Sequence, residues 1–294
     1  MTTVFAPRPT FDVPTAHGAV LRLGERCLVM GILNVTPDSF AETEPLLDPG
    51  NAVAAALRME AGGADLIDVG GESTRPGADP VSAAEELRRV VPVLRALRGR
   101  VGIPLSIDTY KAGVARAAIE AGAVIVNDVS GLQREPALAL EVARTGAALI
   151  LMHSRGSSKT MYAEASYGDV LADVIEELRE SIATAVDGGV RSEQILIDPG
   201  VGFAKRASHS YGVLARLPEL AAALDRPMLV GPSRKSFLRD ALGERPAPER
   251  DWGTAAAVTA AVLAGAHIVR VHAVAEMAQV VRVTEEIRRG GLGA

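Results

Sequence analysis

Polar residues follow directly after a short apolar run in the first third of this chain. The run 66–69 ends in two glycines, and the next residues up to Gly77 supply a carboxylate, two hydroxyls, a guanidinium and a proline. Short apolar runs bounded by Gly and Pro are typical of buried parallel strands, and α/β barrels carry their chemistry on the loops at the carboxyl ends of such strands. The stretch 63–77 therefore predicts a buried strand followed by a functional loop.

The same pattern recurs along the whole chain. Further apolar runs cover residues 28–34, 103–109, 124–128, 147–153, 195–200, 227–235 and 267–272. Polar residues at or near their carboxyl ends are Asn34, Asp108, Asn127, His153, Asp198, Lys235, Arg270 and His272. Because the carboxyl ends of parallel barrel strands meet at one mouth, we expect these side chains to converge there.

The residue types in this set indicate the chemistry of a ligand. Two carboxylates, an amide and an ammonium suit a flat heterocycle with several hydrogen-bond donors and acceptors. Arg270 and His272, together with Mg²⁺, suit a phosphate group. The combination predicts a phosphorylated heteroaromatic substrate.

Helical segments separate the apolar runs and must position their ends. Helical periodicity is found in residues 51–61, 80–97, 112–121, 170–186 and 254–264, and glycines at helix ends recur in 61–64, 121–123, 145–147 and 264–266. Regular alternation of strand and helix favours a parallel sheet, and eight such units close a barrel of about 250 residues. We predict an α/β fold, a (β/α)8 TIM barrel over residues 27–290 within a single domain, 1–294. A β-hairpin at about 11–26 is expected to plug the barrel floor.

Composition excludes several classes of function. No apolar run approaches the length of about 18 residues that a membrane span needs. A net charge of −5 without a basic stripe argues against a nucleic-acid partner. The single cysteine, Cys27, permits no internal disulfide, so we expect a cytoplasmic protein with Cys27 as a small buried group. The Pro-rich and charged segment 239–251 is predicted to be an exposed excursion with little chemistry.

Structural roles for some of these polar residues remain open at this point. Asp108 or Thr109 would serve as a helix cap, and Asp198-Pro199-Gly200 as a turn, for backbone reasons alone. His153 fits either a ligand pocket or a hydrogen-bonded rim. The histidines lack the spacing of a zinc site, and neither a Gly-x-Ser-x-Gly elbow nor a Walker or dinucleotide glycine loop is present.

Several motifs, in order and each at a different predicted strand end, resemble those of the dihydropteroate synthase family. They are MGILNVTPDSF (30–40), GADLIDVGGESTRPG (63–77), SIDTYKA (106–112), VNDVSG (126–131), LMHSRG (151–156), IDPGVGFAK (197–205), GPSRKSF (231–237) and RVH (270–272). The similarity runs from Met30 to about Met277.

This resemblance implies an activity, a cofactor and a set of site residues. The family joins 4-aminobenzoate to a dihydropterin methyl diphosphate, releases diphosphate with the help of Mg²⁺, and is the target of sulfonamides. The implied pterin and diphosphate residues are Thr74, Asp108, Asn127, Asp198, Lys235, Arg270 and His272, the 4-aminobenzoate residues are Arg75, Pro76, Phe203, Ser233 and Arg234, and the Mg²⁺ residue is Asn34. The implied catalytic residues are Asp38, Arg75 and Lys235. A homodimer formed through the last helices is also implied.

Two alternatives from other classes remain. After Phe40 the chain reads Ala-Glu-Thr-Glu (41–44), where the family usually has Ser-Asp-Gly-Gly, so a non-catalytic pterin-binding homologue is the second hypothesis. Asn34, Asp38, Arg75 and Lys235, all present, weigh against it. A pterin-dependent corrinoid methyltransferase is the third, but it has no need for the Arg75-Pro76 and 233–235 segments.

Overall fold

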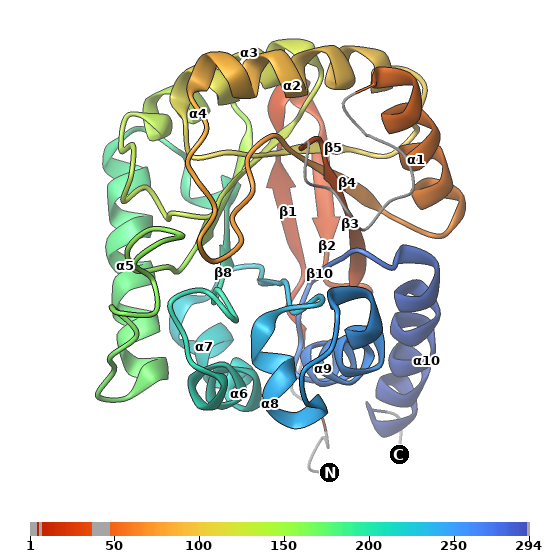
Figure 1. Cartoon of the computed structure of the whole chain (residues 1–294), viewed down its shortest axis with the longest axis vertical. Coiled ribbons are helices and arrows are strands. Elements are labelled where there is room, and N and C mark those ends of the chain that lie inside the picture. The colour runs from red at the N-terminus through yellow and green to blue at the C-terminus, as the bar shows by residue number, and fades with distance from the viewer. Residues whose placement is uncertain (1–4, 6–7, 37–47, 293–294) are drawn as a thin grey trace.

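The computed structural model describes Phe5 and residues 8–36 and 48–292. Eight parallel strands form its central sheet: β3 (Leu28–Asn34), β4 (Leu66–Gly70), β5 (Leu105–Asp108), β6 (Ile125–Asp128), β7 (Ala148–Met152), β8 (Ile195–Asp198), β9 (Leu229–Val230) and β10 (Ile268–Val271). Their order is β8-β7-β6-β5-β4-β3-β10-β9, and a parallel bridge between Ile197 and Met228 brings the two outer strands together. The sheet thus closes into a barrel surrounded by helices, which confirms the predicted (β/α)8 fold (Figure 1).

Most strands are shorter than the apolar runs that predicted them. The run 227–235 contains only two residues of strand, Leu229 and Val230. Beyond them the backbone turns away from the sheet: Arg234 has a φ of 57°, and its N–H donates to Thr254 Oγ1 at 3.0 Å. A left-handed conformation is costly for a residue with a side chain, and such residues concentrate at functional sites.

The predicted helices correspond to α1 (Pro49–Ala61), α2 (Ala83–Leu97), α3 (Ala112–Ala121), α5 (Val170–Asp187) and α9 (Asp251–Leu263). The chain also forms α4 (Leu138–Thr145), α6 (Ala207–Ala215), α7 (Leu217–Leu224), α8 (Arg239–Leu242) and α10 (Val274–Leu292). The start of α2 at Ala83 corrects the predicted start at residue 80, because Ser82 Oγ caps the helix by accepting from Glu85 N at 3.2 Å. Gly146 ends α4 in the expected left-handed conformation, with φ of 70°.

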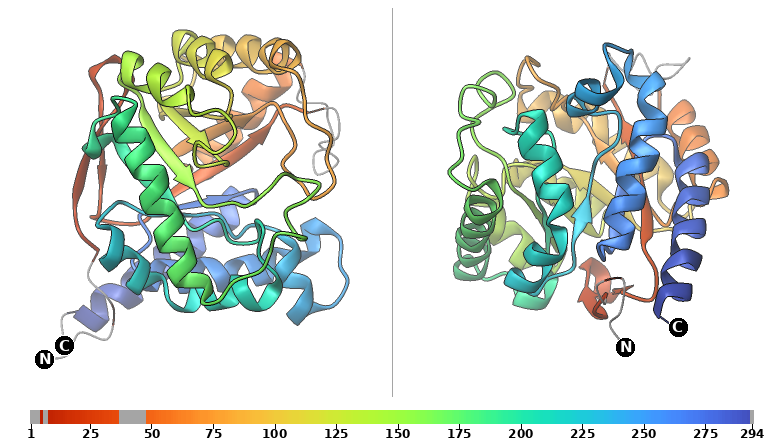
Figure 2. Two further views of the ribbon diagram at one scale, coloured as in Figure 1. Left: turned by 90° about the vertical axis from the view of Figure 1, so that its left-hand side faces the viewer. Right: turned by 90° about the horizontal axis from the view of Figure 1, so that it is seen from below.

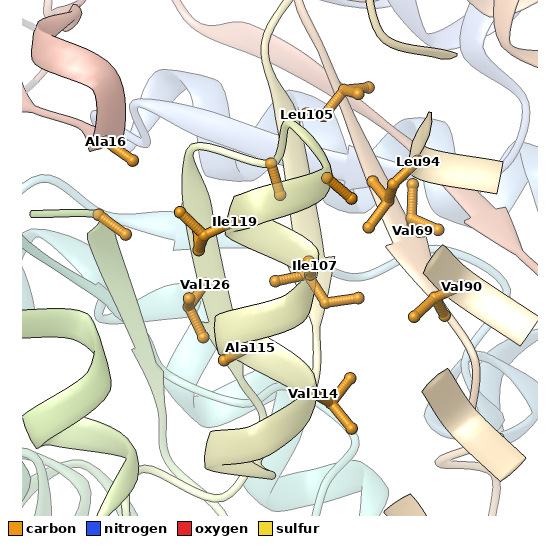
Figure 3. Packing of buried hydrophobic residues seen from close by; sticks show 14 of the residues in the cluster. Ala16, Val69, Val90, Leu94, Leu105, Ile107, Val114, Ala115, Ile119 and Val126 are labelled. Atoms are coloured by element: carbon orange, nitrogen blue, oxygen red, sulfur yellow. The ribbon is translucent and has the colours of Figure 1, made fainter. Parts of the chain in front are cut away.

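Alternation along each strand sorts the side chains into two layers. Outward residues such as Val69, Ile107 and Val126 pack with Val90 and Leu94 of α2 and with α3 (Figure 3). Inward residues at the amino ends of the strands form an apolar floor that includes Met30, Leu66, Ile125, Leu196 and Ile268. Since strand side chains alternate with period two, the inward positions near the carboxyl ends fall on Asn34, Asp68, Asp108, Asn127, Asp198 and Arg270. The barrel is therefore apolar below and polar at its mouth.

The predicted hairpin covers the barrel floor. Strands β1 (Phe11–Pro14) and β2 (Val20–Leu23) pair antiparallel, and the turn between them contains His17 with φ of 62°. Val13 and Leu23 are buried in the same cluster as the inward floor residues, which confirms the plug. The hairpin lies at one end of the barrel (Figure 2).

One other expectation is met in this fold. Cys27 is fully buried, as expected for a small packed group. Within the described residues, no helix is both long enough and apolar enough to cross a membrane.

Candidate active site

A cavity of about 470 Å³ opens at the carboxyl ends of the strands. Most of the predicted site residues line it: Asn34, Thr74, Arg75, Pro76, Asp108, Phe203, Ser233, Arg234, Lys235, Arg270 and His272. Asn127 and Asp198 are buried at the ends of β6 and β8, Asn127 paired with Asp108 and Asp198 close to Gly231, and both of these neighbours line the cavity. Asp38 lies outside the described residues, and so do residues 41–44, where the chain differs from the usual family sequence. The geometry thus brings the described members of the predicted set together at one mouth.

A network of buried ionic hydrogen bonds forms the floor of this cavity. Arg270 donates from Nε to Asp68 Oδ2 at 2.7 Å and from a terminal nitrogen to Asp108 Oδ2 at 2.8 Å. The same Asp68 oxygen accepts from Asn127 Nδ2 at 2.9 Å, while the other Asp68 oxygen is buried without a partner among the described residues. Asp68 therefore links an arginine and an amide from different strands.

Sequence reasoning missed Asp68, although a signal was present. The residue interrupts the apolar run of β4 and is completely buried. Period two places it on the same face as Leu66 and Gly70, which is the face toward the barrel interior. A charge on the inward face of a buried strand needs a partner of opposite charge, and Arg270 provides it.

Lys235 also lines the cavity, and the buried Asp198 lies close to it, because a Cβ at Gly231 would be 3.8 Å from both Lys235 Nζ and Asp198 Oδ2. Lys235 Nζ donates to Val201 O at 2.6 Å and lies 4.3 Å from the centroid of the Phe203 ring. Asp198 Oδ1 accepts from Gly200 N at 2.8 Å, so Asp198 stabilises the predicted turn and is at the same time one of the predicted site residues. Gly202 has φ of 81°, and a Cβ there would lie 2.9 Å from Lys235 Cδ. A side chain at this position would crowd Lys235, and the left-handed backbone favours glycine.

Burial shifts the pKa values of Lys235, Asp108 and Asp198 in the direction that favours their uncharged forms. Desolvation lowers the pKa of Lys235 to about 8, against the attraction of Asp198. Desolvation raises the pKa of Asp108 to about 7, although Arg270 opposes the shift, and burial also raises the pKa of Asp198. Groups poised near neutral pH inside a cleft are typical of functional sites.

His272 acts as a neutral group at the end of β10. Burial and the neighbouring Arg234 and Arg270 lower its pKa to about 3. Its Nδ1 lies 3.0 Å from Ser233 Oγ, and its backbone N–H donates to the same oxygen at 3.1 Å. With the Ser233 hydroxyl donating to Nδ1, the Nε2–H tautomer is favoured, and the ring offers an N–H donor to an anion.

Arg234 is tied to the helix behind the cavity. Its guanidinium makes two hydrogen bonds of 2.8 Å to the Asp251 carboxylate at the start of α9. The side chain is partly buried, and this bidentate pair fixes its orientation. Arg234 therefore lines the cavity with a guanidinium whose charge is already compensated.

The loop after β4 is anchored from the neighbouring unit. Glu72, in this loop, pairs with Lys111, which also pairs with the buried Glu86 of α2. Glu72 Oε2 further accepts from Val81 N at 3.1 Å. These bonds hold the loop that carries Thr74, Arg75 and Pro76 at the rim.

Two structural interpretations left open by the sequence are now decided. His153 does not line the cavity: its ring accepts from Lys205 Nζ at Nδ1 (2.6 Å) and contacts Glu177 Oε2 through Nε2 (3.0 Å). Burial lowers its pKa to about 4, so it is a neutral, hydrogen-bonded histidine. The cap on α3 is not Asp108 or Thr109, because Lys111 occupies the N-cap position and no side chain caps that helix.

The segment 239–251 corrects another prediction. It is largely exposed, as expected, but Arg239, Ala247 and Arg250 line the outer part of the cavity. Arg250 donates to Arg234 O at 2.9 Å and so braces the turn before Lys235. Sequence reasoning missed this role because the fold of β9 and η3 (Ser236–Leu238) alone brings the segment back to the mouth.

The donor set near Asn34 suits a hard cation delivered with a substrate. Among residues 8–36 and 48–292, no three His, Cys, Asp or Glu side chains group closely enough to hold a metal. The Asn34 amide lines the cavity at the end of β3 and offers one oxygen. Mg²⁺ commonly binds through one or two protein oxygens together with substrate phosphates and waters, so this arrangement fits it.

Comparison with known proteins agrees with this geometry. The model of the family "Pterin binding enzyme" matches residues 30–272. Dihydropteroate synthase of Synechocystis sp. is 47% identical over 266 residues, which cover 90% of this chain and 92% of that protein. A solved structure of Xanthomonas albilineans dihydropteroate synthase with 4-aminobenzoic acid has a TM-score of 0.86 at 41% identity, covering 96% of this chain and 98% of that one.

A second solved structure adds the product. Burkholderia cenocepacia dihydropteroate synthase complexed with 7,8-dihydropteroate has a TM-score of 0.83 at 42% identity, covering 95% of this chain and 98% of that one. The similarity therefore extends over nearly the whole chain. The chain belongs to the pterin binding enzyme family, among the dihydropteroate synthases.

Proposed function

We infer that this chain is a dihydropteroate synthase. It is a transferase that condenses (7,8-dihydropterin-6-yl)methyl diphosphate with 4-aminobenzoate and releases 7,8-dihydropteroate and diphosphate. The observation that carries this inference is the convergence of the predicted pterin, diphosphate and 4-aminobenzoate residues in the lining of one cavity or directly beside it. The Burkholderia relative with bound 7,8-dihydropteroate supports it.

The proposed roles follow from the contacts of each group. Asp198 and Asn127 lie deepest and accept and donate at the edges of the pterin ring, with Asp108 and Lys235 completing the pocket. Arg270, His272 and Thr74 receive the diphosphate. Because Arg270 is pre-set by two carboxylates, it needs little reorganisation when charge develops on the leaving group.

The outer half of the cavity is proposed to hold 4-aminobenzoate. Phe203 and Pro76 provide apolar surface for the ring, and Ser233, Arg234 and Arg75 provide polar contacts for the carboxylate. An aromatic amine is neutral at pH 7, so no strong base is needed. The enzyme acts by neutralising the leaving diphosphate and excluding water, with Asp38, Arg75 and Lys235 as catalytic residues.

Mg²⁺ is the proposed cofactor. When bound, it neutralises charge on the diphosphate, and Asn34 is the residue that would hold it. We predict that Asn34→Ala raises the Mg²⁺ concentration for half-maximal activity by about 10-fold, since one protein ligand is lost. Titration of Mg²⁺ in steady-state assays measures this shift, and an unchanged Mg²⁺ response would assign the ion to other residues.

Further proposals concern assembly and compartment. We propose that residues 1–294 act as one pterin-binding domain and that the protein forms a homodimer through its last helices. Val283 and Ile287, one turn apart on α10, are exposed and apolar, which supports such an interface. Sedimentation should give twice the mass of the chain. The single buried cysteine supports a cytoplasmic location, and small molecules rather than nucleic acids or membranes are the proposed partners.

The deciding experiment is a product assay. Purified protein is given the dihydropterin diphosphate, 4-aminobenzoate and Mg²⁺, and dihydropteroate and diphosphate are measured in parallel; equal amounts of both are expected. Retained binding of the pterin diphosphate without product would instead indicate a non-catalytic homologue. Absence of product with methyl transfer to a corrinoid protein would indicate the methyltransferase alternative.

A further inference from the structure

The segment between β7 and α5, residues 153–169, contacts two walls of the cavity. On one side, Ser158 O accepts from Gly77 N at 2.9 Å, and Ser158 Oγ donates to Ala78 O at 2.8 Å. On the other side, the Tyr162 hydroxyl and Ser236 Oγ are hydrogen-bonded at 2.7 Å. The segment therefore joins the loop after β4 to the start of η3, and Figure 1 shows it in green beside the orange loop.

Internal bonds give this segment a defined shape. Ser157 N donates to Thr160 Oγ1 at 2.9 Å, and Met161 N donates to Ser157 O at 2.8 Å. Arg155 bonds Ser166 O and the Glu177 carboxylate, which closes the base of the segment against α5. Met161 thus sits on a braced turn between the two anchored points.

Met161 lines the cavity, and its side chain is only 3% exposed. Its position in the chain, three residues after the contact with Gly77 and one before the contact with Ser236, places it between the rim loop and η3. Phe203 and Pro76 are other apolar groups lining this cavity. A thioether packs well against an aromatic ring and fills an irregular apolar space.

We propose that Met161 is a specificity-determining residue for the aromatic amine, held in place by the Tyr162–Ser236 hydrogen bond. Met161 forms a third wall of the acceptor pocket and limits which substituents the acceptor ring can carry. The proposal rests on the placement of 4-aminobenzoate given above. Its consequence is selectivity for an unsubstituted ring over one with a methyl group.

The test compares Met161→Ala with Met277→Ala, using 4-aminobenzoate, 4-amino-2-methylbenzoate and 4-amino-3-methylbenzoate as acceptors. Met277 is a matched control because it is also 3% exposed but packs in the core of α10, away from the cavity. One methylene in an apolar pocket changes discrimination by about 10- to 200-fold. Met161→Ala should therefore raise kcat/KM for at least one methylated acceptor, relative to 4-aminobenzoate, by about 10-fold or more. Met277→Ala should leave this ratio unchanged.

Two further measurements keep the outcomes distinct. If the ratio stays constant in Met161→Ala while Phe203→Ala raises the KM for 4-aminobenzoate, the inference about Met161 is wrong and the placement of the acceptor stands. If neither Met161→Ala nor Phe203→Ala changes the KM for 4-aminobenzoate, the proposed placement of 4-aminobenzoate is wrong. If Met161→Ala raises the KM for 4-aminobenzoate and the KM for the pterin diphosphate equally, the substitution distorts the whole site, and the proposal is also overturned. Should the alanine variant not fold, Met161→Val tests the same ratio.

The Tyr162–Ser236 bond is tested by a double-mutant cycle. Tyr162→Phe and Ser236→Ala should each raise the KM for 4-aminobenzoate by about 5-fold, the effect of one ordinary hydrogen bond, and leave the KM for the pterin diphosphate unchanged. The double variant should be no worse than either single variant, because both remove the same bond. Additive effects would show that the two residues act independently and would reject the bond as the support of Met161.

Discussion

Replacing Asp68 with asparagine removes the carboxylate that holds Arg270 and Asn127 together beneath the cavity. One Asp68 oxygen accepts from Arg270 Nε at 2.7 Å and from Asn127 Nδ2 at 2.9 Å. The amide oxygen of the variant can occupy that position. Its NH₂ group then points to the site of the other oxygen, which is buried and has no partner among the described residues.

The cost of this change follows from those contacts. A buried donor without an acceptor costs about 1–3 kcal/mol, and an uncompensated charge in a broken buried pair brings the total to about 3–5 kcal/mol of unfolding free energy. Arg270 keeps its bond to Asp108, so the loss in binding is smaller than for full release of the guanidinium. We expect about 1.4–2.8 kcal/mol, which corresponds to a 10- to 100-fold rise in the Kd of the dihydropterin diphosphate.

Asp128→Asn provides the matched control. Asp128 is also completely buried at the end of a barrel strand, but its carboxylate binds Ser130 and Leu132 and does not line the cavity. Chemical denaturation and calorimetric titration with the pterin diphosphate measure both effects. Both variants should lose stability, and only Asp68→Asn should lose affinity. Equal affinity in the two variants would refute the assignment of Asp68 as the residue that positions Arg270.

Three further perturbations test other parts of the site. Lys235→Ala should weaken pterin binding by about 100-fold or more, because it leaves Asp198 as an uncompensated buried charge; wild-type affinity in calorimetry would contradict the pocket assignment. Gly202→Ala should raise the KM for both substrates by about 10-fold, because the added Cβ would lie 2.9 Å from Lys235 Cδ and push that side chain away. The φ of 81° is also strained for alanine. Unchanged kinetics would show that Lys235 has room to move. Asp108 has its pKa raised from 3.8 to about 7 in the folded protein, so the folded state binds more protons across that range and stability falls as pH rises through it. Asp108→Asn should remove this part of the pH dependence in denaturant titrations between about pH 4 and 7, and parallel curves for both proteins would refute the shift.

Local sequence patterns were sufficient to predict the barrel. Eight apolar runs alternating with helical segments leave few arrangements that bury both faces of a strand, and the closed parallel barrel is one of them. The hairpin over the floor was also predictable, because two alternating segments flank a short turn at His17 and Gly18. Strand ends were less accurate: the run 227–235 has the apolar content of a strand, but only Leu229 and Val230 pair, and farther along the run Arg234 is left-handed.

The site was predictable to the extent that it depends on position along a strand. Residues at carboxyl ends, such as Asp108 and Asp198, must meet at the mouth of a parallel barrel whatever the details of packing. Asp68 was not chosen because it lies inside a strand, where its inward direction gains meaning only once Arg270, two strands away in the sheet, is known to face it.

The sequence alone therefore determined the fold, the end of the barrel that carries chemistry, and the motifs that mark the family. The tertiary structure decided which charges pair, which face of each loop meets the cavity, and which distant segments reach the mouth. In the folded protein His153 is a buried hydrogen-bond partner of Lys205, whereas Met161 and Arg250 line the cavity. The physical reason is that periodicity along one chain fixes the direction of a side chain, while its partner, burial and pKa depend on residues that only folding brings within a few ångströms.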